Sequence, residues 1–414
     1  MSRLAPAIDT VSTPSAVQPP RQGRPPKPRV VLVQIDFGSI DHEDRLDEFE
    51  QLACSAGAKP VGKIGGRRKQ PDAATFIGSG KVQEIASLCQ VAQADLVIFN
   101  HELSPAQQRN LERTLCVPVV DRTSLILDIF AQRARSHEGK LQVELAQLAH
   151  LSSRLVRGWT HLERQKGGIG LRGPGETQLE VDRRLIGKRV KFLRERLTHI
   201  TRQRAVRRRA RTRGAVPSIS LVGYTNAGKS TLFNALTHAE SHTADQLFAT
   251  LDTMSRRLYT EELGGHVVLS DTVGFIRELP HTLVDAFHAT LEETAQADLL
   301  LHVVDASNPA HDAQIDAVRQ VLAEIGASEV PTLIVWNKID RTHVAPGIDR
   351  DPHGRIRRVR LSAHTGAGLN DLRAALAEVM ADPQCRLGTS WDIRASKTRV
   401  PNTLAQPART DALS

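Results

Sequence analysis

The sequence predicts an α/β protein in three folded parts: a small parallel α/β domain over residues 29–137, a long antiparallel helical hairpin over 138–213, and a Rossmann-like domain with a mostly parallel sheet over 214–384. In the first and last parts, short β-rich runs alternate with helical stretches, which is the pattern of a parallel sheet covered by helices. In the middle part, leucines recur at helical spacing on both sides of a glycine-rich segment. Residues 1–28 and 385–414 lack apolar periodicity, and we expect a disordered arm and tail there.

The N-terminal domain is predicted from three β-rich runs, 30–35, 95–99 and 117–121, with a helix that opens at Ser104-Pro105. The segment Gly78-Ser-Gly-Lys81 has the composition of a phosphate-binding loop. However, Thr75 stands where such a loop needs its first glycine, and Val82 stands where it needs Ser or Thr. The phosphate-loop pattern therefore fails here, and a different nucleotide or RNA site stays open.

Two sets of apolar residues at helical spacing flank the glycine-rich segment 167–175. The first set is Leu141, Leu145, Leu148, Leu155, Trp159 and Leu162, and the second is Leu179, Ile186, Val190, Leu193, Leu197 and Ile200. Two helices with such apolar stripes must fold back on each other, which carries the glycine-rich segment to the tip of a hairpin. Five glycines in nine residues let a backbone follow a phosphate chain closely, although a plain flexible connector would also use them.

Positive charge is concentrated in the second helix of this hairpin. Residues 183–213 contain fourteen Lys or Arg and one acid, Glu195, whereas the whole chain has a net charge of +9. Such a density is typical of a surface that contacts a nucleic-acid backbone, and we favour RNA over a membrane. The alternative is a solvated surface or a linker, above all for the run 207–213.

The composition indicates a soluble, cytoplasmic protein, and we expect a monomer. With 414 residues, the chain can form two or three cored domains. Its four cysteines, at positions 54, 89, 116 and 385, are scattered, so neither a disulfide framework nor a zinc ribbon is predicted. No apolar run has membrane-spanning length, and the first 27 residues lack the apolar core of a signal peptide.

One string in the last domain has the pattern of a phosphate-binding loop. It follows the apolar run 219–222 and precedes a stretch of helical spacing at 231–236, which is the strand-to-helix context that such a loop needs. We expect the Lys229 ammonium on the β- and γ-phosphates and the Ser230 hydroxyl on Mg²⁺. The residues of the string are Gly223, Tyr224, Thr225, Asn226, Ala227, Gly228, Lys229 and Ser230.

A second string, Asp271-Thr272-Val273-Gly274, ends a β-rich run at 266–270. Asp271 should therefore face the same crevice and hold Mg²⁺ through water. Because Gly274 has no side chain, its N–H can approach a γ-phosphate, a contact that exists only before hydrolysis.

Between these two strings, a switch segment must supply a hydroxyl that closes over the γ-phosphate and Mg²⁺. Thr250 is the favoured residue, and Thr243 and Thr253 are alternatives that spacing does not exclude. The segment predicted to bind the nucleotide is Phe248, Ala249, Thr250, Leu251 and Asp252. Ser230 and Thr250 are the predicted metal ligands.

The base is predicted from the string Asn337-Lys338-Ile339-Asp340, which follows a β-rich run at 332–336. The Asp340 carboxylate can accept from the ring N–H and the exocyclic amine of guanine, a donor pair that adenine lacks. Asn337 would tie the loops together, and the Lys338 stem would lie over the base. Backbone N–H groups at Ser362-Ala363-His364 would meet the guanine oxygen. GTP and GDP are the predicted ligands.

Catalysis should be unusual, because Phe275 stands where many GTPases place a glutamine that orients the attacking water. Hydrolysis must then rely on the backbone, a cation or a partner. Asn226 is the kind of residue that helps hold K⁺ at the phosphates in cation-dependent GTPases, although Asn is equally a common loop residue. The predicted catalytic residues of this P-loop GTPase domain are Lys229, Thr250, Gly274 and Asn226, with slow basal turnover.

These motifs resemble those of the HflX family of bacterial ribosome-associated GTPases. The resemblance rests on residues 77–82, 167–180, 248–252, 271–275 and 337–340. It implies an N-terminal domain that binds the large ribosomal subunit and a hairpin tip that reaches ribosomal RNA near the peptidyl-transferase centre. It also implies a GTP-bound form that helps separate stalled or stress-damaged ribosomes into subunits. Members are typically cytoplasmic, and some associate with the membrane or bind ATP through the N-terminal part.

Many members of this family continue into a small C-terminal domain, whereas residues 385–414 form only a short tail here. The contacts made by such a domain are therefore not predicted for this chain. An alternative function is that of a regulatory GTPase whose basic hairpin binds another RNA, or of an ATP-dependent RNA-remodelling protein that uses the N-terminal domain.

Overall fold

The computed structural model describes residues 27–38, 42–155, 178–213, 216–237, 246–260, 265–280, 283, 286, 287, 291 and 293–381, with only the backbone of 178, 179, 204–213 and 260. The predicted arm up to residue 26, the glycine-rich tip, the predicted tail and Thr243 lie outside the described residues. Within the described part of the chain, none of the helices combines the length and the apolar character that crossing a membrane requires.

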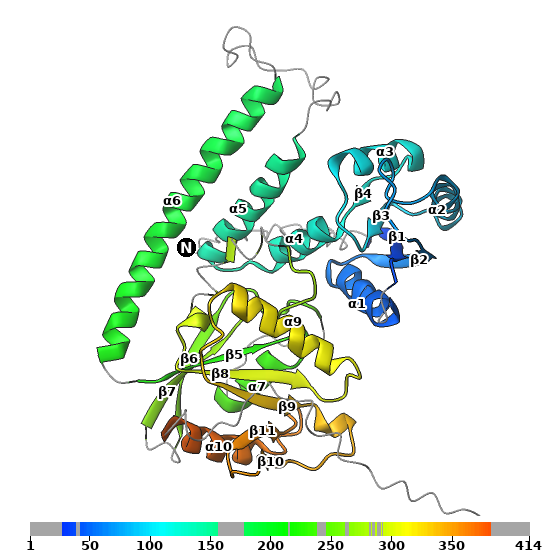
Figure 1. Cartoon of the computed structure of the whole chain (residues 1–414). Helices are drawn as coiled ribbons and strands as arrows, with labels where there is room; N and C mark the ends of the chain where they lie inside the picture. The colour runs from blue at the N-terminus through cyan, green and yellow to red at the C-terminus, as the bar shows by residue number, and fades with distance from the viewer. Residues whose placement is uncertain are drawn as a thin grey trace, which may run out of the picture.

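The N-terminal domain is a parallel sheet with the strand order β2-β1-β3-β4, covered by helices on both faces (Figure 1). Its elements are β1 (Arg29–Asp36), α1 (His42–Ser55), β2 (Lys59–Arg67), α2 (Ser79–Ala92), β3 (Leu96–Phe99), α3 (Pro105–Leu115), β4 (Val119–Val120) and α4 (Arg122–Arg133). Side chains of β1 alternate between the faces, so Val30 and Leu32 pack with α1 and α4, whereas Val31 and Val33 pack with α2 and α3. Helix α3 begins where predicted, because Ser104 and Gln107 form a capping box.

Helices α5 (His137–Arg154) and α6 (Gln178–Arg213) lie side by side and project from the rest of the molecule (Figure 1). Four buried leucines join them, namely Leu141, Leu145, Leu193 and Leu197, all of which belong to the predicted apolar stripes. The guanidinium of Arg189 on α6 also donates to both carboxylate oxygens of Glu144 on α5, at 2.6 and 2.9 Å. The two helices are therefore held together by an apolar seam and a bidentate ion pair.

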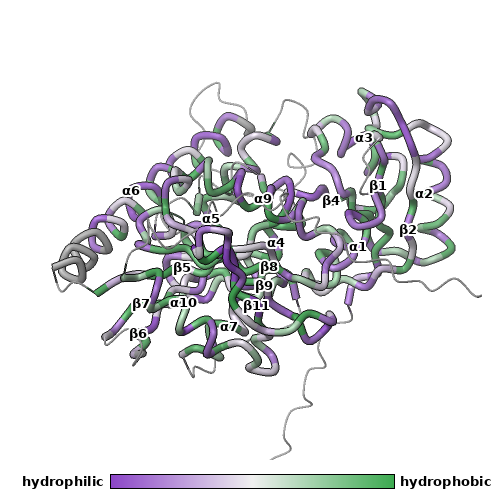
Figure 2. The backbone as a smooth tube through the Cα atoms, turned by 60° about the horizontal axis from the view of Figure 1, so that its bottom comes forward, coloured by the Kyte–Doolittle hydropathy of each residue, from purple (hydrophilic) through white to green (hydrophobic). Residues whose placement is uncertain are grey.

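The C-terminal domain is a seven-stranded sheet with the order β10-β11-β9-β8-β5-β7-β6. The edge pairs β10-β11 and β7-β6 are antiparallel and the other pairs are parallel, which confirms the predicted mostly parallel, Rossmann-like sheet. Its strands are β5 (Ser218–Gly223), β6 (Met254–Thr260), β7 (Gly265–Asp271), β8 (Leu299–Asp305), β9 (Thr332–Asn337), β10 (Gly347–Arg350) and β11 (Ile356–Arg360). Its longer helices are α7 (Lys229–Thr237), α9 (His311–Glu324) and α10 (Leu369–Ala381). The central strands are largely hydrophobic (Figure 2), because both faces of a mostly parallel sheet are covered by helices. The loops that follow the carboxyl ends of the strands therefore provide the polar side chains of a site.

One apolar core connects all three parts of the molecule. It contains Phe130 of α4, Val143 of α5 and Phe248 from the segment before β6. The Phe130 ring lies edge-on to Phe248 and Phe287, with centroids 4.7 and 5.2 Å apart. Loops at the carboxyl edge of the C-terminal sheet are thus packed against the N-terminal domain and the base of the hairpin.

Candidate nucleotide-binding site

The loop between β5 and α7 has the backbone geometry of a phosphate cradle. Its φ angle is +147° at Gly223 and +93° at Gly228. A Cβ on Gly223 would lie 2.2 Å from the carbonyl oxygen of Val303, and a Cβ on Gly228 would lie 2.3 Å from the amide nitrogen of Asn337. Only glycine fits both positions, because conformation and space each exclude a side chain. The loop therefore turns tightly into the N-terminus of α7, a position that favours the binding of an anion.

Lys229 lies across this loop with only 6% of its surface exposed. Its ammonium donates to the carbonyl oxygens of Gly223 and Tyr224, at 3.1 and 2.9 Å. Burial lowers the pKa of Lys229 to about 8, and the nearby Asp271 carboxylate opposes that shift. The side chain is thus fixed in place before any ligand arrives.

Three oxygen-bearing side chains meet beside Lys229. The Ser230 hydroxyl donates to Asp271 Oδ2 at 2.6 Å and lies 2.7 Å from the Thr250 hydroxyl. Asp271 is 1% exposed, and burial raises the pKa of its carboxyl. Its Oδ1 atom is buried and has no hydrogen-bond partner among the described residues. A hard cation such as Mg²⁺ prefers this set of hydroxyl and carboxylate oxygens.

The protein alone does not complete a metal site. In the described residues, no group of three or more His, Cys, Asp or Glu side chains is placed to hold a metal ion. Mg²⁺ commonly completes its octahedron with water and substrate phosphates, and this donor set fits that mode of binding.

The loop after β7 is hydrogen-bonded to the phosphate loop. Phe275 N donates to the Gly223 carbonyl at 3.1 Å, and Thr225 N donates to the Phe275 carbonyl at 2.7 Å. These bonds hold Gly274 so close that a Cβ there would lie 2.9 Å from both Lys229 Nζ and the Thr225 Cα atom. The Phe275 side chain is 1% exposed and belongs to the shared apolar core, so it does not face the pocket.

The loops after β9 and β11 are joined to the phosphate loop by Asn337. Its amide nitrogen donates to the Ala227 carbonyl at 2.9 Å, and its amide oxygen accepts from Ala363 N at 2.9 Å. The Ser362 hydroxyl donates to Asp340 and holds the pKa of that exposed carboxyl below its usual value. A carboxylate fixed in its charged form is able to accept from a base that presents two adjacent donors.

Three family models match consecutive stretches of the chain. They are the GTP-binding GTPase N-terminal family over residues 43–131, the GTP-binding GTPase middle region over 133–211 and the 50S ribosome-binding GTPase family over 218–338. GTPase HflX of Escherichia coli K12 is 58% identical over 351 residues, which cover 84% of this chain and 82% of that protein. The chain belongs to the HflX family of GTPases. The predicted family and enzyme class are both confirmed.

A second HflX protein is similar over a comparable share of the chain. GTPase HflX of Caldanaerobacter subterraneus subsp. tengcongensis is 49% identical, with 84% of this chain and 80% of that protein covered. Among solved structures, a GTP-binding protein of Sulfolobus solfataricus in complex with GDP is 25% identical, with a TM-score of 0.44 and coverage of 83% and 96% of the two chains. This HflX-family chain thus spans most of the length of the relatives that it matches.

The structure brings many of the predicted residues of this HflX-family chain into one pocket. The pocket is lined by Thr225, Asn226, Gly228, Lys229, Ser230, Thr231, Gln246, Phe248, Ala249, Thr250, Thr272 and Gly274. Thr231 and Gln246 were not predicted, although Thr231 directly follows the predicted phosphate loop and Gln246 lies two residues before the predicted switch segment. Of the two candidate switch threonines that the structure describes, Thr250 lies beside Ser230.

Some predicted residues have other partners. The side chains of Leu251, Val273 and Ile339 are buried, and Lys338 pairs with Asp305 at 2.7 Å. The Asp252 carboxylate accepts from the backbone at the start of α5 instead of lining the pocket. The structure thus places Asp252 against Arg135 and Ser136, which directly precede α5, and the contact of Asp252 with the nucleotide stays a prediction.

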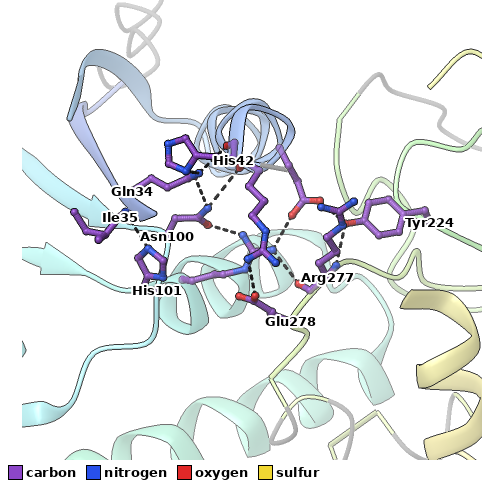
Figure 3. Close-up of polar contacts among 11 residues, drawn as sticks. Gln34, Ile35, His42, Asn100, His101, Tyr224, Arg277 and Glu278 are labelled. Carbon is purple, nitrogen blue, oxygen red and sulfur yellow. Dashed lines mark hydrogen bonds and ion pairs between the residues drawn. The ribbon is translucent and has the colours of Figure 1, made fainter. Parts of the chain in front are cut away.

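The phosphate loop of this HflX-family chain also contacts the N-terminal domain (Figure 3). The Tyr224 hydroxyl donates to Glu48 of α1 and accepts from Arg277 N at 2.9 Å. The buried Arg122 guanidinium donates to Glu48 at 2.8 Å and to the Arg277 carbonyl at 2.9 Å. Arg45 adds an ion pair to Glu278 at 2.8 Å. No motif indicated this network, because its members are far apart in the sequence.

Proposed function

We propose that this chain is a GTP-hydrolysing switch that binds the large ribosomal subunit and separates stalled ribosomes under stress, as a cytoplasmic monomer. The observation that carries the proposal is the position of the hairpin. The basic helix α6 is fixed to α5, and the start of α5 contacts Asp252, two residues from Thr250 in the nucleotide pocket. The matched model of 50S ribosome-binding GTPases supports the large subunit as the partner.

The surface of α6 suits RNA. Its exposed side chains include Arg183, Lys188, Lys191, Arg194 and Arg202. Phe192 is also exposed, and the guanidinium groups of Arg189 and Arg196 lie 5.3 and 5.4 Å from its ring centroid. Cations and an exposed aromatic ring are the groups that hold a phosphate backbone and stack on an unpaired base. These features support ribosomal RNA as the ligand of the hairpin.

In the nucleotide site, we propose GTP or GDP with Mg²⁺ held by Ser230 and Thr250 and, through water, by Asp271. When bound, Mg²⁺ would neutralise negative charge on the phosphate oxygens. Lys229 would bind the terminal phosphates from the opposite side, and Asp340 would select guanine. Asn226 has a φ of +61° and lines the pocket, which supports its proposed role in holding K⁺ beside the phosphates.

We expect hydrolysis by the isolated protein to be slow. The Phe275 side chain lies in the core and carries no polar group that orients water. The nearby Gly274 N–H can bind a γ-phosphate, but this contact does not deprotonate or align a nucleophile. A partner or a cation must therefore supply what the side chain lacks.

A second candidate function uses ATP at the N-terminal domain. The strand order β2-β1-β3-β4 places a topological switch point between β1 and β3, where open α/β sheets bind ligands. His101 follows β3 there and accepts from Ile35 N at 3.1 Å, and burial lowers its pKa to about 4. This arrangement favours a neutral imidazole at the carboxyl edge of the sheet, and the topological switch point is the observation that supports the alternative of an ATP-dependent RNA-remodelling protein.

The test is GTP turnover by the full chain, alone and with purified large subunits, in sodium and in potassium buffer. We expect slow turnover alone, faster turnover in potassium, and at least about tenfold acceleration by the subunits. A variant that lacks residues 167–175 should keep the slow basal rate and lose the acceleration. Fast GTP turnover by the isolated chain in sodium buffer would contradict the proposed catalytic mechanism. ATP-dependent RNA unwinding by a chain whose GTP turnover does not respond to large subunits would favour the second candidate.

A further inference from the structure

The segment 246–252 connects the nucleotide pocket to the base of the hairpin. Its residues Gln246, Phe248, Ala249 and Thr250 line the pocket. Asp252 lies two residues after Thr250. Its carboxylate does not line the pocket but accepts hydrogen bonds from the backbone at the start of α5. Two extended residues span at most about 7 Å, so Thr250 and Asp252 cannot move independently over a larger distance.

Asp252 caps helix α5 from outside that helix. Its Oδ2 atom accepts from Arg135 N at 2.9 Å and from Ser136 N at 2.8 Å, and its Oδ1 atom accepts from the Ser136 hydroxyl. The same hydroxyl is the N-cap of α5, because it accepts from Gly139 N at 2.8 Å. The carboxylate thus completes a chain of hydrogen bonds at the positive end of the helix dipole.

Gly139 provides the space for this contact. A Cβ on Gly139 would lie 2.1 Å from Asp252 Oδ1, closer than two non-bonded atoms can approach. The backbone of Gly139 is helical, so no unusual backbone angle requires a glycine there. The missing side chain instead allows Asp252 to approach. Alanine is intrinsically a better helix former than glycine, yet a methyl group there would displace the carboxylate.

The segment 246–252 and helix α5 are both packed into the shared apolar core. Leu251 and Phe248 share the apolar core with Val143 and Ala146 of α5. Leu247 N donates to the Ser55 hydroxyl at 3.0 Å, which fixes the segment to the N-terminal domain as well. Helix α5 in turn is joined to α6 by the leucine seam and the Arg189–Glu144 pair. A displacement of Asp252 would therefore also displace helices α5 and α6.

We infer that Asp252 is a positioning residue that couples closure of the segment 246–252 over bound GTP to the orientation of the hairpin. In the structure, the Thr250 hydroxyl lies at the metal-binding oxygens while Asp252 is docked on α5. The structure combines both contacts in one conformation, so we expect GTP to strengthen the cap and GDP, which lacks the γ-phosphate contact, to loosen it. The inference rests on the proposed function only for the nature of the hairpin's ligand.

The coupling is reciprocal, so it can be measured without ribosomes. In the wild type, we expect slower hydrogen exchange of the amides of residues 135–139 with a non-hydrolysable GTP analogue than with GDP. Gly139→Ala should remove this difference and weaken binding of the GTP analogue about tenfold while GDP affinity stays within about twofold. Gly187→Ala is the matched control, because a Cβ at this α6 glycine meets no atom within 4 Å.

Two further variants keep the test informative if Gly139→Ala folds poorly. Ser136→Thr retains the hydroxyl and should behave as the wild type, whereas Ser136→Ala should reproduce the loss. Equal exchange of residues 135–139 with both nucleotides in the wild type, or equal affinity ratios for the two glycine variants, would overturn the inference. A chain that shows the coupling but does not bind large subunits would instead contradict the proposed function.

Discussion

At the scale of the residue, Lys229 shows how burial prepares the site for a ligand. The side chain is almost fully buried, and two loop carbonyls hold its ammonium. Its pKa of about 8 lies below the ordinary 10.5 because burial disfavours the charged form. Bound phosphates would favour the charged form and raise the pKa again. Proton uptake should therefore accompany nucleotide binding above about pH 8.

This linkage predicts how GDP affinity depends on pH. Below pH 8, Lys229 is already protonated and affinity should be nearly constant. Above pH 8, affinity should fall by up to about tenfold per pH unit, because each binding event must first protonate the lysine. Calorimetry at pH 9 in two buffers of different ionisation enthalpy measures the proton uptake directly. Absence of proton uptake at pH 9 would show that phosphates do not contact Lys229.

We propose that base selection depends on Asp340. One of its oxygens accepts from Ser362, which fixes the carboxylate at the edge of the site. Asp340→Asn should weaken GTP and GDP binding by about 100-fold or more, because an amide NH₂ would face the donors of guanine. The variant should bind xanthosine triphosphate instead, since xanthine presents an oxygen where guanine presents an amine. Tight GTP binding by a folded Asp340→Asn variant, measured with a fluorescent nucleotide, would refute the assigned role.

At the scale of the element, the hairpin depends on a narrow apolar seam. Leu193 is fully buried between α5 and α6, whereas Leu185 on the same helix is 52% exposed. Leu193→Ala should destabilise the packing of α6 by about 2–5 kcal/mol, because it removes buried methyl groups and leaves a cavity. Leu185→Ala should cost less than about 1 kcal/mol. Hydrogen exchange along α6 measures both, and similar effects of the two variants would mean that the helices do not pack through this seam.

The sequence predicted elements whose signals are local. The phosphate loop was predictable because its glycines encode backbone angles within eight residues, and the hairpin was predictable because its leucines keep a helical period. Strand β2 was not predicted, because Lys59–Arg67 is rich in Gly and Lys and lies at the edge of the sheet, where no apolar run is required.

Contacts between parts of the chain could not be predicted in this way. Glu48 meets Tyr224 although 176 residues separate them, and neither residue belongs to a motif that describes the contact. Asp252 was predicted to bind the nucleotide as part of the segment 248–252, and no local signal indicated that the tertiary fold places Arg135 and Ser136 within reach of its carboxylate. Partner choice of this kind depends on packing, which a single sequence does not encode locally.

At the scale of the whole molecule, the described residues form one packed unit with two surfaces, the nucleotide pocket and the basic face of α6. The nucleotide pocket lies at the carboxyl edge of the C-terminal sheet, and the loops around it share a core with the N-terminal domain and α5. The basic face of α6 is attached to the same core through α5. Packed side chains therefore connect the nucleotide pocket to the basic face of α6, which we propose binds RNA.

The most direct test of the central claim is the affinity of the full chain for purified large ribosomal subunits, measured by sedimentation with a non-hydrolysable GTP analogue and with GDP. We predict that the chain binds large subunits at least about tenfold more tightly with the GTP analogue than with GDP. In the Asp340→Asn variant, the corresponding xanthosine analogue should restore this tight binding and the GTP analogue should not. Equal affinity for the subunits with both guanine nucleotides would contradict the claim that the nucleotide site controls the hairpin.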